Sequence, residues 1–255
     1  NGIDTSKVYI SSKVHIITSI HKEEDIKKYQ KQQGSTGKGI APCAKSKFGR
    51  EGVRLCDINN SLKQKYQNNI FYSTNNKNTP IEGTILCEGA QGFWLDINFG
   101  NYPYVTSSTT LPYSSCSLGF PPQKIRNIYG AAKIYDTRVG KDPDFDDLEQ
   151  NDILNQIAEV GKEFGSTTGR LRKVYWLNID KLVQAVNISG TTHLIISKID
   201  VLQKVGYYRF LENGRIHNFL SLDYLIKEIN RILKSSCSLL KEIIYSDNPE
   251  IIDGI

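Results

Sequence analysis

The chain of 255 residues contains no methionine, not even at its first position, which is Asn1. We therefore expect the sequence to be a fragment that lacks its natural N-terminus. No apolar run approaches the ~18 residues that a membrane-spanning helix needs, and no charged-then-apolar signal peptide opens the chain. These absences argue against membrane and secreted proteins, and we expect a cytoplasmic protein.

Paired cysteines are also missing. The chain has five cysteines, none of them at C-x-x-C spacing, so the sequence indicates neither a zinc site nor a disulfide framework. The net charge of +5 is modest and forms no long basic stripe of the kind that nucleic-acid binders carry. A protein that handles small anions would have this charge, and so would many ordinary protein surfaces.

Apolar patterning predicts strands and helices in alternation. We expect short strands over 7–10 and 13–17 and an exposed helix over 22–33 that ends near Gly34. The asparagine-rich stretch 66–80 is typical of a surface loop. The run "GTILCEGAQG", 83–92, indicates a buried parallel strand whose end opens on a functional site.

The second half of the chain continues this alternation. The prolines and spaced apolar residues of 121–132 predict a helix, followed by a strand through Ile134. We further expect a helix over 153–158, a buried strand in "HLIISKIDVL" (193–202), a hairpin that turns at 213–214, a helix through 225–232 and a last strand over 242–246. The pattern indicates an α/β fold with a mainly parallel central sheet flanked by helices.

The stretch "EFGSTTGRLR", 163–172, concentrates groups that bind anions. Its glycines allow backbone N–H groups to approach a ligand, its hydroxyls add donors, and Arg170 and Arg172 can each clamp a carboxylate or phosphate. If the segment is extended, the two arginines point to the same side. A polar turn with solvated arginines would have the same composition.

Three other motifs leave alternatives open. "GSTGKGI" resembles a phosphate-binding loop, but Lys38 is followed by Gly39 where a P-loop has serine or threonine, and a flexible basic loop explains it equally. Glu88 and Gln91 lie at the end of the apolar run that begins at Gly83, where the Gln91 amide could contact a heterocycle or simply cap a strand. Lys198 and Asp200 follow another apolar run and could read a guanine or form a surface ion pair.

The order of the motifs is more specific than any one of them. "GSTGKGI.P", "EGAQG.WLDI.FG.YP.VTSS.TT", "TRVG", "EFGSTTGR.R..WL" and "K.DVL" succeed one another as they do in adenylosuccinate synthetases. The chain resembles that family from its first strands to its C-terminus. The resemblance implies one domain over 1–255 with a P-loop-NTPase-like architecture, and a homodimer. It also implies a GTP- and Mg²⁺-dependent ligase that joins L-aspartate to IMP.

The resemblance carries residue roles by matching position. Gln91 and Lys47 are similar to catalytic residues, and Arg50 to an arginine that reaches the partner subunit's nucleotide. The implied IMP contacts are Thr36, Arg50, Gln91, Thr106 and Arg170. The implied aspartate loop is Ser166, Thr167, Thr168, Gly169, Arg170, Leu171 and Arg172. The implied GTP contacts are Arg172, Lys198, Ile199, Asp200, Ser246, Asp247 and Asn248.

The chain also departs from the family pattern. Ala44 stands where a tyrosine is usual, Leu171 replaces an arginine of the aspartate loop, and the terminal "SDNPE" matches the usual glycine-containing segment poorly. The glycine-rich N-terminal phosphate loop, with its catalytic aspartate and most Mg²⁺ ligands, is absent, and so is the later catalytic histidine. None of the four histidines matches that position, and no metal ligand is assigned.

Two alternative functions remain at the level of the sequence. A viral relative, 2-aminoadenylosuccinate synthetase, acts on dGMP, and the short C-terminal region keeps it in consideration. The other alternative is a fragment that binds nucleotide without catalysis. The reading frame upstream would separate them, because it would show whether the glycine-rich loop and its aspartate are encoded.

Overall fold

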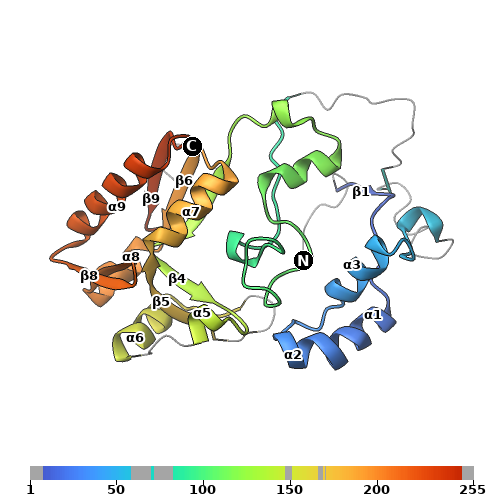
Figure 1. Ribbon diagram of the computed structural model, residues 1–255, viewed down its shortest axis with the longest axis horizontal. Helices are drawn as coiled ribbons and strands as arrows, with labels where there is room; N and C mark the ends of the chain where they lie inside the picture. Colours follow the sequence, from blue (N-terminus) through green and yellow to red (C-terminus); the bar gives the residue numbers. More distant parts are fainter. Residues whose placement is uncertain are drawn as a thin grey trace. The chain divides into compact units, whose positions relative to one another are not determined.

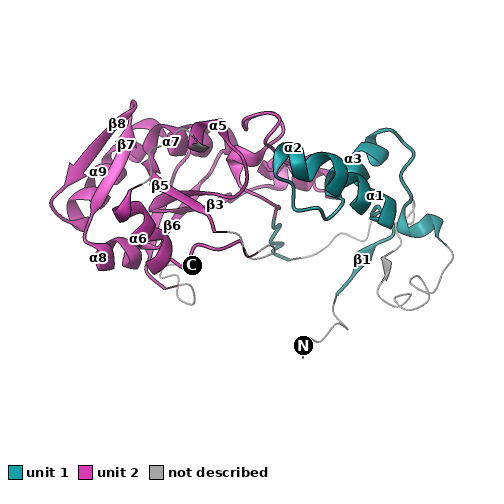
Figure 2. Cartoon of the chain, turned by 90° about the horizontal axis from the view of Figure 1, so that it is seen from below, with its two compact units in different colours: residues 1–88 teal, residues 89–255 magenta. Residues whose placement is uncertain are grey.

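The computed structural model describes residues 8–58, 70–71, 83–146, 151–165, 169 and 171–248. The chain divides into two compact units, residues 1–88 and residues 89–255, coloured teal and magenta in Figure 2. The expectation of a single domain over 1–255 stays a prediction.

Unit 1 is built mainly from helices. A continuous helical run comprises α1 (Ser19–Glu24), the π-helical η2 (Asp25–Gln30) and α2 (Lys31–Gln33). Thr18 caps its start by accepting a hydrogen bond from the His21 amide, and Gly34 ends it in the left-handed conformation. The helix expected over 22–33 is therefore confirmed.

The rest of unit 1 departs from the expected strands. The basic stretch after Gly34 contains a helix, α3 (Ile40–Phe48), which packs against α1 and is followed by a 3₁₀ turn, η3 (Leu55–Asp57). β1 (Ile10–Ser11) pairs in parallel with β2 (Ile70–Phe71). The strand expected over 13–17 is wrong, because that segment makes only an isolated antiparallel bridge between His15 and Arg54.

The first sheet of unit 2 is entirely parallel. It has the order β3 (Tyr129–Lys133), β6 (His193–Ser197) and β9 (Glu242–Ser246). Lys133 is the register partner of Ser197, and Ser197 is the register partner of Ser246. The carboxyl ends of all three strands therefore meet at one edge. The strands expected within 193–202 and over 242–246 are confirmed.

The second sheet is mixed. Its order is β4 (Tyr135–Arg138), β5 (Lys173–Asn178), β7 (Tyr208–Glu212) and β8 (Arg215–Phe219). Only the β5–β7 pair is parallel. β7 and β8 form the expected hairpin, and its turn residues Asn213 and Gly214 have positive φ angles of 48° and 72°. A two-residue hairpin turn whose twist matches the flanking strands needs positive φ at both central residues. Asparagine and glycine adopt such angles readily, which explains the Asn-Gly pair.

Helices cover both sheets (Figure 1). They are α5 (Pro143–Asp146), α6 (Asp152–Val160), α7 (Ile179–Ser189), α8 (Ile199–Val205) and α9 (Leu222–Ser236). α6 packs on β5, and α9 packs on β7 and β8. The core between helices and strands includes Trp176, Leu154 and Ile229, each at most 1% exposed. The helices expected over 153–158 and 225–232, and the α/β fold, are confirmed.

Two further expected elements are wrong. The predicted helix over 121–132 is a 3₁₀ turn, η7 (Pro122–Lys124), followed by strand β3. Pairing with β6 overrides the helical spacing there, and Gly130 fits because a Cβ atom would lie 2.9 Å from the Thr191 methyl carbon. The run 83–92 is not a strand and is exposed, with Leu86 85% exposed. An apolar run forms a strand only beside a hydrogen-bonding neighbour, and no described strand pairs with it.

Two 3₁₀ segments, η5 (Phe93–Leu95) and η6 (Pro112–Leu118), lie in the loop-rich part that precedes β3. Among the residues that the structure describes, no helix is long and apolar enough to cross a membrane.

Candidate functional site

The carboxyl edge of the parallel sheet gathers polar side chains from all three strands. Lys133 ends β3, Lys198 directly follows β6, and Ser246 ends β9. The register places Lys133, Ser197 and Ser246 side by side. Ligands of open α/β sheets bind outside the carboxyl ends of the strands. This edge is therefore the candidate site. Six of the seven predicted GTP contacts lie at or directly after the ends of β6 and β9: Lys198, Ile199, Asp200, Ser246, Asp247 and Asn248.

Lys198 and Asp200 each have a partner of their own. Lys198 adopts a left-handed conformation with φ of 69° before α8, and its Nζ donates a 3.0 Å hydrogen bond to the Gly161 carbonyl oxygen. Asp200, in the first turn of α8 beside Ile199, pairs with Lys204 at 2.8 Å. The alternative that Lys198 and Asp200 form an ion pair with each other is not what the structure shows. Their guanine-reading role stays a prediction.

The end of β9 makes a tight polar turn at the same edge. Ser246 is buried, and its hydroxyl donates a 2.8 Å hydrogen bond to the Asn248 carbonyl oxygen. Asp247 between them is exposed. The structure thus brings Ser246, Asp247 and Asn248 to the same sheet edge as Lys198.

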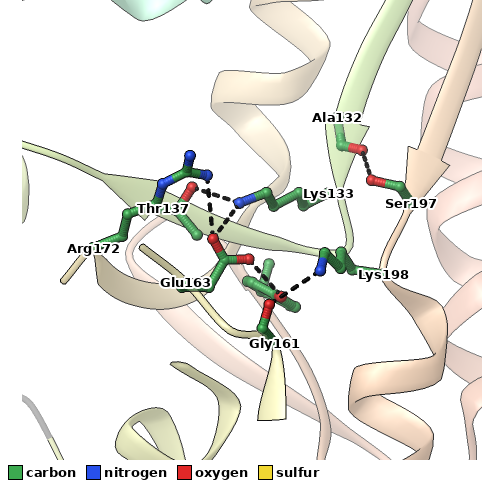
Figure 3. A network of polar contacts seen from close by, with 9 residues as sticks. Ala132, Lys133, Thr137, Gly161, Glu163, Arg172, Ser197 and Lys198 are labelled. Atoms are coloured by element: carbon green, nitrogen blue, oxygen red, sulfur yellow. Dashed lines mark hydrogen bonds and ion pairs between the residues drawn. The ribbon is translucent and has the colours of Figure 1, made fainter. Parts of the chain in front are cut away.

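Next to this edge lies a polar network centred on Glu163 (Figure 3). Glu163 Oε2 accepts hydrogen bonds from Lys133 Nζ at 2.6 Å and from Arg172 Nη1 at 3.2 Å. Its Oε1 accepts from the Tyr135 hydroxyl at 2.8 Å. Lys133 Nζ also donates to Thr137 Oγ1 at 3.1 Å. One buried carboxylate therefore joins strands β3, β4 and the residue that precedes β5.

Electrostatics explain why this carboxylate is ionised. Burial raises the pKa of Glu163, but the hydrogen bonds from Lys133 and Tyr135 and the charges of Lys133 and Arg172 outweigh burial, so its pKa lies below the usual value. Burial lowers the pKa of Lys133, and the contact with Glu163 opposes that effect. Burial and the nearby carboxylate raise the pKa of Tyr135, which therefore remains a hydrogen-bond donor.

The same network closes the base of the predicted aspartate loop. Phe164 and Leu171 form an isolated antiparallel bridge, and the Arg172 amide donates to the Glu163 carbonyl oxygen at 2.9 Å. Within the loop, the Gly169 amide donates to the Gly165 carbonyl oxygen at 2.8 Å.

The other predicted members of this loop, Ser166, Thr167, Thr168 and Arg170, lie outside the described residues. Of the predicted members that are described, Leu171 is 62% exposed, whereas the Arg172 side chain turns to Glu163.

Gln91 and Thr106 belong to a second region of unit 2 whose shape depends on Asp96. The buried Asp96 carboxylate accepts hydrogen bonds from the amides of Asn98 and Thr110 and from the Thr109 hydroxyl. These contacts lower its pKa although burial, the largest single effect, raises it. The Thr106 amide donates to the Leu95 carbonyl oxygen at 2.8 Å. Gln91 is exposed, with a positive φ of 71°.

Thr36, Lys47 and Arg50 lie in unit 1, and all three are exposed. Lys47 lies in the last turn of α3, and Arg50 follows that helix with φ of 63°. Thr36 lies between α2 and Gly39, the residue that caps α3. The structure therefore groups these three around one helix and presents their side chains to solvent.

Sequence reasoning missed Lys133, Tyr135 and Glu163 as members of the site. All three lie inside or beside motifs that had been recognised: Glu163 opens "EFGSTTGR", and the other two precede "TRVG". A charged residue within a strand pattern, such as Lys133, is the signal that could have found them. Among the described residues, no group of three or more His, Cys, Asp or Glu side chains could hold a metal ion.

Comparison with known proteins agrees with the motif order. The adenylosuccinate synthetase family model matches residues 1–82 and 74–209. The adenylosuccinate synthetase of Malacoplasma penetrans is 34% identical over an alignment that covers 100% of this chain and 67% of that protein. The enzyme of Helicobacter hepaticus is 37% identical over 86% of this chain and 64% of its own length. The enzyme of Azobacteroides pseudotrichonymphae is 37% identical over 77% of this chain and 57% of its own length.

Two solved structures share the fold. Fully ligated adenylosuccinate synthetase from Plasmodium falciparum superposes with a TM-score of 0.70 at 24% identity, covering 94% of this chain and 76% of that one. Succinoaminodeoxyadenylate synthetase of cyanophage S-2L, bound to dGMP and dATP, superposes with a TM-score of 0.61 at 15% identity, covering 94% and 66%.

The chain spans about 57–67% of the length of the three curated relatives described above. By the family model, by these identities and by its fold, the chain belongs to the adenylosuccinate synthetase family.

Proposed function

We propose that the protein catalyses the GTP-dependent ligation of L-aspartate to IMP, which forms adenylosuccinate through 6-phosphoryl-IMP in AMP biosynthesis. The observation that carries this proposal is the relation to a curated adenylosuccinate synthetase over the entire chain, at 34% identity. The polar edge of the parallel sheet supports it, because six of the seven residues assigned to GTP lie at or directly after the ends of β6 and β9.

The reaction has a clear physical requirement. The purine 6-oxygen is a poor leaving group, so it is first phosphorylated by GTP, and the aspartate amine then displaces phosphate. Catalysis of such a transfer consists largely of positioning and of electrostatic stabilisation of the phosphoryl group and the 6-oxygen. We assign Gln91 and Lys47 to this step and Thr36, Arg50, Gln91, Thr106 and Arg170 to IMP binding.

The guanine of GTP is assigned to the carboxyl edge of the sheet. Asp200 can accept hydrogen bonds from the ring N–H and amino group of guanine, and Lys198 lies two residues before it. The backbone turn of Ser246, Asp247 and Asn248 lies beside Ser197 in the neighbouring strand. In this proposal Asp200 exchanges its exposed contact with Lys204 for the base.

L-Aspartate is assigned to the loop 166–172. Lys133 and Arg172 both contact the Glu163 carboxylate, so two cations share one negative charge there. This surplus of positive charge favours a dicarboxylate ligand. We assign aspartate to the loop residues Ser166, Thr167, Thr168, Gly169, Arg170, Leu171 and Arg172.

The proposal includes Mg²⁺, a homodimer that shares Arg50 across its interface, and a cytoplasmic location. The described residues offer no cluster of metal ligands, so they do not fit a complete Mg²⁺ site, and no step is assigned here to the metal.

The direct test is a steady-state assay of the full-length gene product with L-aspartate. IMP or dGMP is offered as acceptor and GTP or ATP as phosphoryl donor, and the product is identified by mass spectrometry. We expect adenylosuccinate from IMP with GTP. Turnover of dGMP in preference to IMP would assign the protein to the activity of the phage relative. Nucleotide binding without product in any combination would contradict the ligase proposal.

A further inference from the structure

The motifs assigned no role to Glu163. Its carboxylate nevertheless contacts three side chains beside the candidate site, those of Lys133, Tyr135 and Arg172. We propose that Glu163 is a positioning residue. Its carboxylate holds the Arg172 guanidinium at the base of the loop so that Arg172 is oriented for a dianionic substrate. This inference rests on the proposed function and names a residue on which recognition of that substrate depends.

The geometry of Glu163 suits such a role. The residue is 2% exposed, and both of its carboxylate oxygens are used. Its backbone is also joined to Arg172, because the Arg172 amide donates to the Glu163 carbonyl oxygen. The two ends of the loop are thus connected once through the main chain and once through side chains. A buried carboxylate with fixed partners has little freedom to move, so it can fix the arginine.

Arg172 remains able to take a further acceptor. Its side chain is 28% exposed, and only Nη1 makes the contact with Glu163. Nε is buried and has no hydrogen-bond partner among the described residues. The pairing with Glu163 therefore leaves donor capacity unused, and an unpaired buried donor is costly. A planar guanidinium has five N–H donors, so Arg172 can contact Glu163 and a substrate carboxylate together.

The negative charge of Glu163 is required as well as its shape. Lys133 and Arg172 both contact the same oxygen, Oε2, at 2.6 and 3.2 Å. Without a negative charge between them, the two cations repel each other, and Arg172 moves away. A glutamine at this position keeps the size of the side chain and can still bond to Tyr135. Its amide has no charge to hold two cations on one oxygen.

Limited proteolysis tests the positioning directly. Trypsin cleaves after Arg172 only when the arginine leaves Glu163 and enters the protease pocket. In Glu163→Gln, we expect cleavage after Arg172 to accelerate about tenfold or more, because the charge-assisted contact that holds the arginine is lost. Glu163→Asp keeps the charge but shortens the side chain, and it should accelerate cleavage too. Cleavage after the exposed Arg215 serves as the internal standard and should not change.

A matched control removes the same charge elsewhere. Glu159 is exposed on α6, and Glu159→Gln should leave cleavage after Arg172 at the wild-type rate. If Glu163→Gln does not fold, Glu163→Asp carries the test, with thermal unfolding used to confirm that it is folded. Wild-type cleavage rates after Arg172 in a folded Glu163 variant overturn the inference, whatever reaction the protein catalyses.

Kinetics of the full-length protein then separate positioning from general stability. We expect Glu163→Gln to raise the KM for L-aspartate about tenfold or more, while the KM for IMP changes less than threefold. An equal rise of both constants, or a fall of kcat alone, contradicts positioning of Arg172 for the dianion. Lack of activity in the wild-type protein contradicts the proposed function but leaves the proteolysis result valid.

Discussion

The buried carboxylate of Asp25 accepts a 2.7 Å hydrogen bond from the amide of Gly39, fourteen residues away along the chain. The bond joins the π-helical part of the first helical run to the cap of α3. Gly39 has φ of +85°, and a Cβ atom there would lie 2.8 Å from Ile17 Cγ2 and 3.1 Å from the Lys22 amide nitrogen. The loop that contains Thr36 can therefore take this position only because residue 39 is a glycine, which has no Cβ atom.

Gly39→Ala should consequently destabilise unit 1. The left-handed conformation disfavours alanine, and the close contacts add to the cost, so we expect a loss of about 1–3 kcal/mol in the free energy of unfolding. Gly83→Ala is the matched control, because Gly83 has φ of +98° but open space around a Cβ atom. Chemical denaturation of the two variants measures the difference. Equal stabilities would show that the close approach at Gly39 is unimportant.

Replacement of Asp200 tests the guanine assignment. Asp200→Asn should weaken GTP and improve the relative use of ITP or XTP, because the carboxylate accepts from both the ring N–H and the amino group. The substitution also releases Lys204, so Lys204→Ala is needed as a control that breaks the same 2.8 Å ion pair and keeps Asp200. kcat/KM for the three nucleotides decides the matter. An unchanged preference in Asp200→Asn removes this residue from the base site.

Arg172→Lys tests whether the loop needs a guanidinium. Lysine cannot make two parallel contacts with a carboxylate. We expect the KM for L-aspartate to rise about ten- to a hundredfold, with little change for IMP. Leu171→Arg is the control, because Leu171 is exposed, whereas the neighbouring Arg172 side chain turns to Glu163. Damage from Leu171→Arg equal to that from Arg172→Lys would refute this assignment of the loop.

Asp136 predicts a pH dependence of stability. Burial raises its pKa to about 6, although the Asn178 amide and the Lys181 charge act in the opposite direction. The folded protein therefore binds more protons than the unfolded chain between about pH 4 and pH 6, and stability must fall as the pH rises through this window.

Asp136→Asn keeps an acceptor for the Asn178 amide and should abolish that fall. At pH 7 the variant should have a higher Tm than the wild type, and at pH 4 the two should be similar. Thermal unfolding across this pH range is the measurement. Parallel Tm curves for the two proteins would mean that Asp136 does not titrate with a raised pKa.

The proposed sharing of Arg50 between subunits can be tested by complementation. Arg50→Leu should raise the KM for IMP, since Arg50 is exposed after α3 and is assigned to the partner's nucleotide. Mixed with an inactive Gln91→Ala protein, it should regain activity, because a hybrid dimer has one site with neither substitution. Absence of recovery at every mixing ratio would count against a shared site.

Local patterns in the sequence were sufficient for elements whose stability is mostly local. The apolar stripe Leu225, Ile229 and Ile232 predicted α9, and Asn213-Gly214 predicted the β7–β8 hairpin, because helix faces and tight turns depend on neighbours within a few residues. The order of motifs likewise predicted the family.

Tertiary structure alone decided the remaining features. The apolar run 83–92 is exposed, and the helical spacing over 125–132 ends in a strand, because strand formation depends on partners that are distant in sequence. The Glu163 network has the same origin. Lys133 lies thirty residues before Glu163, and Arg172 lies nine residues after it. The three side chains meet because the end of β3, the start of β5 and the loop between 163 and 172 lie close together in the fold. The buried charge of Glu163 interacts with residues that are close in space but distant in sequence, so no local sequence pattern predicts which residues these are.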